Sequence, residues 1–338
     1  MNAREFRRWF TAKASGAFCA AAPTMPMAGA AALERFMAIV GGRLPVLGAH
    51  VRANLRAAGL FTPDVHKAYF EQVGVHLANA LRILKFQSRP ERVSELARAQ
   101  IAVDASITQL RDALAAGRGA IVAAPHVCNY VLTLVRLNQE IPITVYLRWS
   151  SDERKRELKH AWCRAAGLPV ILEAPDAANP AARAAACVEA LHYGAALVMT
   201  PDIAQKDSDK GVPVRLLGRK PCLPSGPASI AMLAEAPIVP VFGRLEGRRH
   251  VITVAPPIFV QSLSRAEGGR RMALHRAMQI WADGFAEFLA AFPQAWFLWA
   301  DSRWTRVFGG DIRYLGELPG PSEGGSPATS SQSALETA

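Results

Sequence analysis

The sequence predicts a single α/β domain with a mixed, mostly parallel sheet flanked by helices. Three observations carry this prediction. Short apolar runs recur along the chain, stretches with helical spacing separate most of them, and residues 48–310 contain no internal repeat and no obvious linker. Because strands that alternate with helices usually pair in parallel, one sheet covered by helices is the simplest architecture for such a pattern.

The predicted strands are short apolar runs, bounded by polar residues, glycines or prolines. They cover residues 120–124, 143–147, 169–172, 195–199, 238–242 and 251–254. Two longer segments, residues 63–86 and 263–292, have apolar side chains at the three-and-four spacing of an amphipathic helix. Pro293 ends the second of them. We expect both helices to pack on the core.

The two ends of the chain differ from this pattern. Residues 1–47 open with basic side chains and continue through an Ala-rich stretch, which prolines, Glu34 and Arg35 interrupt. This stretch is therefore shorter than the roughly 20 apolar residues of a membrane-spanning helix, and we predict a basic, Ala-rich, membrane-interfacial N-terminus. A signal peptide is the competing interpretation. Residues 320–338 are rich in Ser, Gly, Pro and Thr and predict a flexible tail.

The formal charge of +11, from 39 Lys and Arg against 28 Asp and Glu, favours an anionic partner such as a membrane surface or an acidic carrier protein. No basic low-complexity arm is present, so nucleic acid is not an expected partner. The five cysteines form no C-x-x-C pair, and Asp207 and Asp209 lack the spacing of a calcium loop. We therefore expect no metal site, and a reducing cytosolic setting.

The most informative motif is PHVCNYV at residues 125–131, directly after the apolar run 120–124. A histidine at the exit of a buried strand, with a helix expected through residues 132–137, is well placed to act as a general base. Asn129 is expected to cap that helix or to orient its neighbours. Taken alone, a histidine at a strand end is more often structural than catalytic.

Other short blocks surround this motif in a fixed order. They are RANL at 52–55, GRG at 117–119, RAAG at 164–167, Pro201-Asp202, GVPV at 211–214 with GRKP at 218–221, PSGPA at 224–228, FPQAW at 292–296, and Trp299 with Arg303-Trp304. In this order the sequence resembles the bacterial lipid A biosynthesis lauroyl/myristoyl acyltransferase family, part of the lysophospholipid acyltransferase superfamily. The resemblance covers roughly residues 50–305 and makes residues 48–310 an acyltransferase-like domain.

The resemblance implies transfer of a fatty acyl group from acyl carrier protein or coenzyme A to a hydroxyl or amine of a glycolipid-like or specialised-metabolite acceptor. It implies no cofactor besides the thioester co-substrate. It also implies a place at the cytoplasmic face of the inner membrane, either peripheral or anchored by the N-terminus. The family's catalytic base corresponds to His126.

The family pairs its base with an acid in a His-x4-Asp/Glu motif, and here Val131 has the place of the acid. Several alternatives stay open. Asp202 follows another predicted strand and can reach His126, because strand ends converge at one edge of a sheet. A substrate carboxylate or phosphate can orient the ring, or Cys128 can act as a nucleophile, although a small buried cysteine is the simpler interpretation. The remaining alternative is a catalytically inactive lipid-binding pseudoenzyme or scaffold.

Three arginines complete the predicted site. Arg164 offers a planar guanidinium to an oxyanion or to the donor's phosphates, and otherwise forms a surface ion pair. Arg219, beside Lys220, is expected to bind an acceptor phosphate unless it belongs to a solvated turn. Arg303 is either a headgroup contact or an arginine stacked on core aromatics. The predicted catalytic residues are His126, Asp202 and Arg164, and the predicted substrate-binding residues are Asn129, Arg219 and Arg303.

Overall fold

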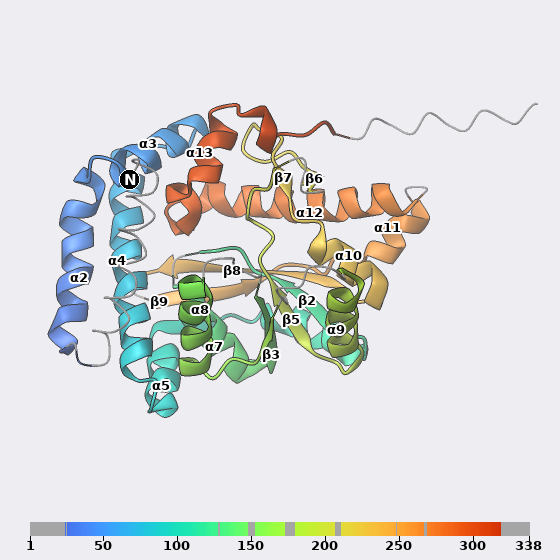
Figure 1. Cartoon of the computed structure of the whole chain (residues 1–338), viewed down its shortest axis with the longest axis horizontal. Helices are drawn as coiled ribbons and strands as arrows, with labels where there is room; N and C mark the ends of the chain where they lie inside the picture. The colour runs from blue at the N-terminus through green and yellow to red at the C-terminus, as the bar shows by residue number, and fades with distance from the viewer. Residues whose placement is uncertain are drawn as a thin grey trace, which may run out of the picture.

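The computed structural model describes residue 24 and residues 26–127, 129–147, 153–172, 180–206, 211–247, 249–266 and 269–318. Its centre is a seven-stranded sheet in the order β1-β9-β8-β2-β5-β3-β4 (Figure 1). These strands are β1 Ile101–Val103, β2 Ala120–Ala123, β3 Ile143–Leu147, β4 Val170–Leu172, β5 Ala196–Met199, β8 Ile238–Glu246 and β9 Arg249–Val254. A separate two-stranded sheet pairs β6 Val212–Pro213 with β7 Cys222–Leu223.

Five neighbouring strands, β8, β2, β5, β3 and β4, run parallel to one another. The pairing of β8 with β9 is antiparallel, and β1 pairs parallel with β9. The sheet is therefore mixed and mostly parallel, which confirms the predicted fold class. The strand β1 was not predicted, because its three residues are too few to show a period in the sequence.

Helices cover both faces of the sheet (Figure 1). They are α2 Met27–Val40, α3 Leu47–Ala57, α4 Pro63–Lys85, α5 Pro90–Gln100, α6 Ile107–Ala115, α7 Tyr130–Glu140, α8 Glu153–Ala165, α9 Pro180–His192, α10 Gly226–Ala234, α11 Val260–Ala266, α12 Arg270–Ala291 and α13 Ser302–Phe308. Short 3₁₀ turns, η1 Gly41–Arg43, η3 Pro293–Ala295, η4 Phe297–Ala300 and η5 Ile312–Tyr314, join them.

The alternation of side chains along β2 shows how the two faces are filled. Ile121 and Ala123 belong to one core, with the aromatic side chains of α12, whereas Ala120 and Val122 belong to the other, with α5, α6 and α7. All four of these side chains are completely buried. Successive residues of a strand point to opposite faces, so a strand buried on both sides has a continuous apolar sequence. This explains why the run after Gly119 shows no polar alternation.

The predicted helix at residues 63–86 is confirmed as α4, with the Thr62 side chain capping its first turn. The single helix predicted at residues 263–292 is wrong. Two helices, α11 and α12, take its place, and Gly269 precedes α12 with a φ of 152°. That backbone conformation is open to glycine and rarely to other residues, so it ends the helical path between the two.

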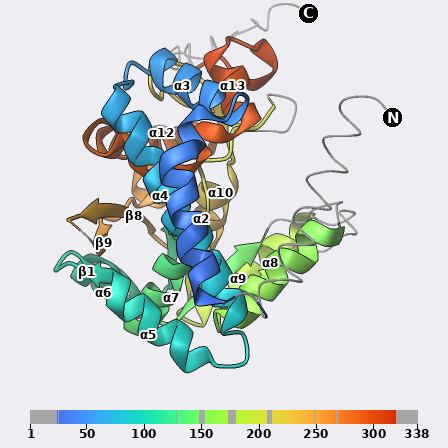
Figure 2. The same ribbon diagram turned by 90° about the vertical axis from the view of Figure 1, so that its left-hand side faces the viewer.

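At the N-terminal side, α2 packs along α4, as Figure 2 shows from the side. Ala30 and Met37 are its buried side chains. Within the described ranges, no helix has both the length and the hydropathy needed to cross a bilayer. The tail predicted at residues 320–338 and the basic start of the chain lie outside the described residues.

Candidate active site

The strands β2 and β5 bring His126 and Asp202 together. These strands are parallel neighbours, and their last residues, Ala123 and Met199, are paired in register. His126 follows Ala123 by the same three-residue interval at which Asp202 follows Met199. Because both segments leave the sheet at its carboxyl edge, the equal interval places the two side chains side by side. The structure therefore shows the predicted contact in which Asp202 reaches His126.

Four hydrogen bonds hold Asp202 in place. Its Oδ1 lies 2.8 Å from Nδ1 of His126, and its Oδ2 accepts from the backbone N–H of His126 at 2.8 Å and from Nε1 of Trp296 at 2.9 Å. The Asp202 backbone carbonyl accepts from Nε1 of Trp304 at 3.0 Å. The Asp202 side chain is completely buried, so these N–H donors replace the water that a carboxylate needs.

This arrangement sets the tautomer of His126. Both oxygens of a carboxylate accept hydrogen bonds. Nδ1 of His126 is therefore the protonated nitrogen, and its N–H donates a hydrogen bond to Asp202. The lone pair of the ring is then on Nε2. The His126 side chain is 27% exposed, in contrast to its buried partner, so the ring is accessible from outside. An imidazole held in this way by a buried carboxylate has the tautomer that a general base requires.

Tyr130 and Val131 lie beside this pair, at the start of α7. The Tyr130 ring stacks on the His126 ring, with centroids 5.3 Å apart and an interplanar angle of 29°. Burial raises the pKa of the Tyr130 hydroxyl, and the nearby Asp202 adds to this effect. Tyr130 is therefore a neutral packing surface for the imidazole. Val131 is half-buried and packs against the core that includes α7, and its apolar side chain offers the imidazole no acceptor.

Three completely buried tryptophans, Trp296, Trp299 and Trp304, support the site from behind. Trp296 contacts both other rings edge-on, with centroid distances of 4.8 and 4.7 Å. The sequence showed these tryptophans as part of a family signature, but it did not show that two of them donate hydrogen bonds to Asp202. A run rich in tryptophan next to a buried acid is the signal that points to this role, because indole N–H groups need buried acceptors.

Among the described residues, none of the three predicted arginines forms a hydrogen bond with His126, although Arg303 lies close enough to Asp202 for their charges to interact. Arg164 is exposed on the last turn of α8. Arg219 donates from its Nη2 to the Phe308 carbonyl at 2.9 Å, in the turn between β6 and β7. Arg303 forms a two-point contact with Asp301, at 2.9 and 2.6 Å, and its side chain is 39% exposed. The predicted roles of these arginines remain predictions.

Asn129 precedes α7, as expected, but its side chain does not cap the helix. It is 1% exposed, and its amide bonds to Asn79 and lies 3.2 Å from the His250 ring. A side chain buried and bonded in this way supports the site from inside, and its predicted role in substrate binding remains a prediction. Cys128, Asp207 and Asp209 lie outside the described residues.

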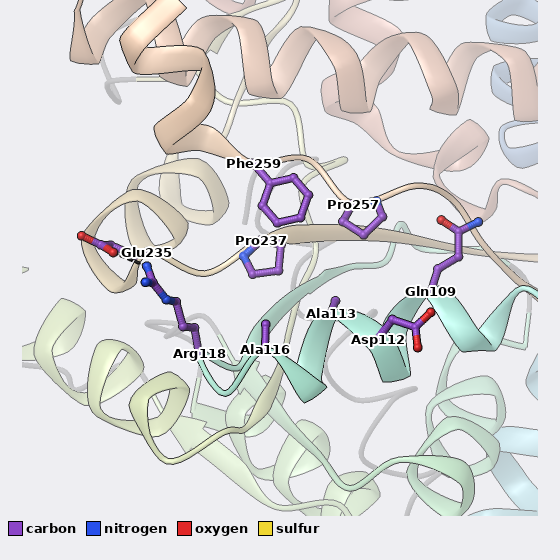
Figure 3. A pocket seen from close by; sticks show the side chains of 9 residues that line it. All are labelled: Gln109, Asp112, Ala113, Ala116, Arg118, Glu235, Pro237, Pro257 and Phe259. Atoms are coloured by element: carbon purple, nitrogen blue, oxygen red, sulfur yellow. Dashed lines mark hydrogen bonds and ion pairs between the residues drawn. The ribbon is translucent and has the colours of Figure 1, made fainter.

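A cavity of about 520 Å³ lies elsewhere on the molecule (Figure 3). Its lining includes Arg118, which precedes β2, and Pro237, which precedes β8, together with the half-exposed ring of Phe259. Arg118 and Pro237 mark the amino ends of the parallel strands β2 and β8. The cavity is therefore at the opposite edge of the sheet from His126 and Asp202.

A mostly parallel α/β sheet that presents a carboxylate-bound imidazole at its carboxyl edge is suited to acyl transfer from an activated ester. The model of the bacterial lipid A biosynthesis acyltransferase family matches residues 63–306, and the chain belongs to this family. The protein is therefore an acyltransferase enzyme. No curated protein matched the sequence significantly.

Proposed function

We propose that the protein transfers a fatty acyl group from a carrier thioester to a hydroxyl or amine, with His126 as the general base. Nε2 of His126 takes the proton from the acceptor as the acceptor's oxygen or nitrogen attacks the thioester carbonyl. The tetrahedral intermediate then collapses, the C–S bond breaks, and the proton passes to the leaving thiolate. The 2.8 Å contact between His126 and Asp202 supports this proposal, because the carboxylate stabilises the imidazolium that forms in between.

We further propose a glycolipid-like acceptor and a donor that is either acyl carrier protein or acyl-coenzyme A. The family supports acyl transfer in lipid A-type biosynthesis, and the +11 charge favours both anionic donors and anionic headgroups. The test is thiol release by the full chain from long-chain acyl carrier protein and, separately, from the matching acyl-coenzyme A, each with a total lipid extract. Turnover with only one of the two thioesters identifies that thioester as the acyl donor. Binding of lipid without turnover of either donor would favour the inactive alternative.

The enzyme is proposed to work on an anionic membrane surface, with α2 and the segment after it as the contact. Large apolar side chains are exposed there, namely Phe36 at 48%, Ile39 at 64% and Val46 at 68%. Arg35 and Arg43 are exposed beside them. Apolar side chains that enter the interface, with basic ones that meet anionic headgroups, are the features by which a helix lies on a bilayer.

The double variant Phe36→Ser/Ile39→Ser is expected to bind vesicles containing phosphatidylglycerol at least about tenfold more weakly, since two side chains lose their burial in the bilayer. Co-sedimentation with the vesicles measures this. The matched control is Leu233→Ser/Phe259→Ser, which removes two comparably exposed apolar side chains from another part of the molecule. Equal loss of binding in both double variants would show that α2 is not the contact.

A further inference from the structure

Asn129 has a backbone conformation that needs support. Its φ is 67°, which is uncommon for a residue other than glycine, and it is 1% exposed. A residue in this conformation persists where its surroundings hold it. Asn129 follows His126 by three residues and directly precedes α7, so the contacts that hold Asn129 also hold the turn that carries His126.

Asn129 is held by two histidines that come from distant parts of the chain. Its backbone N–H donates to Nδ1 of His76, on α4, at 3.0 Å. Its side-chain Nδ2 lies 3.2 Å from Nδ1 of His250, on β9. The backbone N–H of Asn129 can only donate, so Nδ1 of His76 must be unprotonated and the proton of that ring must be on Nε2.

The direction of the other contacts follows from a guanidinium, which only donates hydrogen bonds. Nη1 of Arg82 donates to Oδ1 of Asn79 at 2.7 Å, and this orients the Asn79 amide. Nδ2 of Asn79 then donates to Oδ1 of Asn129 at 2.8 Å. The Asn129 amide is oriented in turn, so its Nδ2 donates to His250, and His250 carries its proton on Nε2.

Both histidines must be neutral to accept these hydrogen bonds, and their surroundings favour this. Burial lowers the pKa of His76 to about 4, with further lowering by the charges that His126 and His250 carry when protonated. Burial likewise lowers the pKa of His250 to about 4. Nε2 of His250 is buried with no hydrogen-bond partner among the described residues. A buried N–H without a partner lowers the stability of the fold. The hydrogen bond that Nδ1 of His250 accepts from Asn129 accounts for a histidine at this position.

The turn is also held at its other end, because the N–H of Phe297 donates to the His126 carbonyl at 2.9 Å. The Phe297 ring packs against His76, with centroids 4.7 Å apart. His76 therefore contacts the neighbours of His126 on both sides, through the Asn129 N–H and through the Phe297 ring.

We propose that His76 is a positioning residue for acyl transfer, whose Nδ1 holds the Asn129 N–H and thereby fixes the turn that carries His126. This inference rests on the proposed role of His126 as the base. His76 acts through the backbone of the turn and touches neither substrate nor the reacting atoms. His250 supports the same turn from the Asn129 side chain.

Two amide variants of the full chain test the acceptor at Nδ1. The oxygen of an asparagine at position 76 falls near the place of Nδ1, whereas the oxygen of a glutamine falls near the place of Nε2. His76→Asn is therefore expected to keep kcat within about threefold of wild type, and His76→Gln to lose about 10- to 100-fold, the scale of an ångström's displacement of a catalytic group. KM is expected to change little in either variant.

A second readout separates positioning from simple loss of stability. A displaced base slows the chemical step in each folded molecule, so His76→Gln is expected to lower kcat even where its folded fraction at the assay temperature equals that of wild type. The control is His66→Gln on the same helix, where the His66 ring bonds to the Gly48 carbonyl. This variant loses the ring contacts of His66 with Phe61 and Phe70, so it is expected to lower the melting temperature while keeping the kcat of wild type.

Nitrogen-15 spectra of the histidine rings test the tautomers without an activity assay. They are expected to show His76 and His250 neutral, with the proton on Nε2, between pH 8 and 5. A proton on Nδ1 of His76, or equal kcat in the two position-76 variants, would overturn the inference while leaving the proposed function intact. Absence of any turnover in wild type, or full turnover in His126→Ala, would overturn both.

Discussion

Replacement of His126 with alanine is expected to lower kcat for acyl transfer by about 10⁴-fold or more, the scale seen when a base is removed from a hydrogen-bonded catalytic unit. The reason is that Nε2 of His126 is the atom left free to take a proton once Nδ1 donates to Asp202. The fold is expected to survive, because the ring is partly exposed and packs mainly on Tyr130. Single-turnover release of thiol from the preferred acyl donor measures this loss.

The control for this experiment is His192→Ala, at the exposed end of α9. This variant removes an imidazole of the same size from the surface and is expected to keep wild-type turnover. If His126→Ala retained turnover while it remained folded, the general base would have to be sought elsewhere in the molecule.

Asp202→Asn is expected to lower kcat by about 10³- to 10⁴-fold without unfolding the protein. The structure determines how the new amide is oriented. Two N–H donors, the His126 backbone and the Trp296 indole, point at the place of Oδ2, so the amide oxygen takes that place. The amide nitrogen then faces Nδ1 of His126. Because two donors cannot pair, the ring shifts its proton to Nε2 and loses its basic lone pair.

Measurement of kcat together with the melting temperature separates this chemical effect from destabilisation. Asp112→Asn is the matched control, since Asp112 is exposed and lines the cavity at the opposite edge of the sheet. Val131→Glu in the wild-type background is expected to change kcat by less than about threefold, as Nδ1 already has a carboxylate partner. A large gain from Val131→Glu would argue against Asp202 as the partner.

Much of the fold could be predicted from the sequence, because period and composition are local properties. Six apolar runs predicted strands that the sheet contains, and the long helix α4 was predicted to within one residue. The Gly268-Gly269 pair in the sequence indicates the break between α11 and α12. The prediction missed this break because the apolar spacing continues on both sides of the pair. The strand order could not be predicted, since the neighbours of a strand are set by packing and not by its own residues.

In the candidate site, too, local sequence pattern predicts some features and packing determines the others. His126 could be selected from its place after a strand, and Asp202 from the general convergence of strand ends. Their contact depends on β2 and β5 being neighbours with matched register, which the sequence does not state. The contacts of Asn129 span 53 and 121 positions to His76 and His250, so no local pattern reveals them. The family resemblance could not supply them either, because those two residues belong to none of the shared blocks.

The location of Asp202 also bears on how enzymes of this kind can diverge. When base and acid share one turn and helix, each substitution in that helix is constrained by the reaction. Here the proposed acid, Asp202, follows a neighbouring strand, so under this proposal position 131 is free to vary as packing allows, and the diagnostic residue can be lost while the reaction is kept. Chains that lack the acid of the His-x4-Asp/Glu motif should therefore be classified by the residues that lie beside the histidine in space. Otherwise active enzymes will be classified as inactive pseudoenzymes.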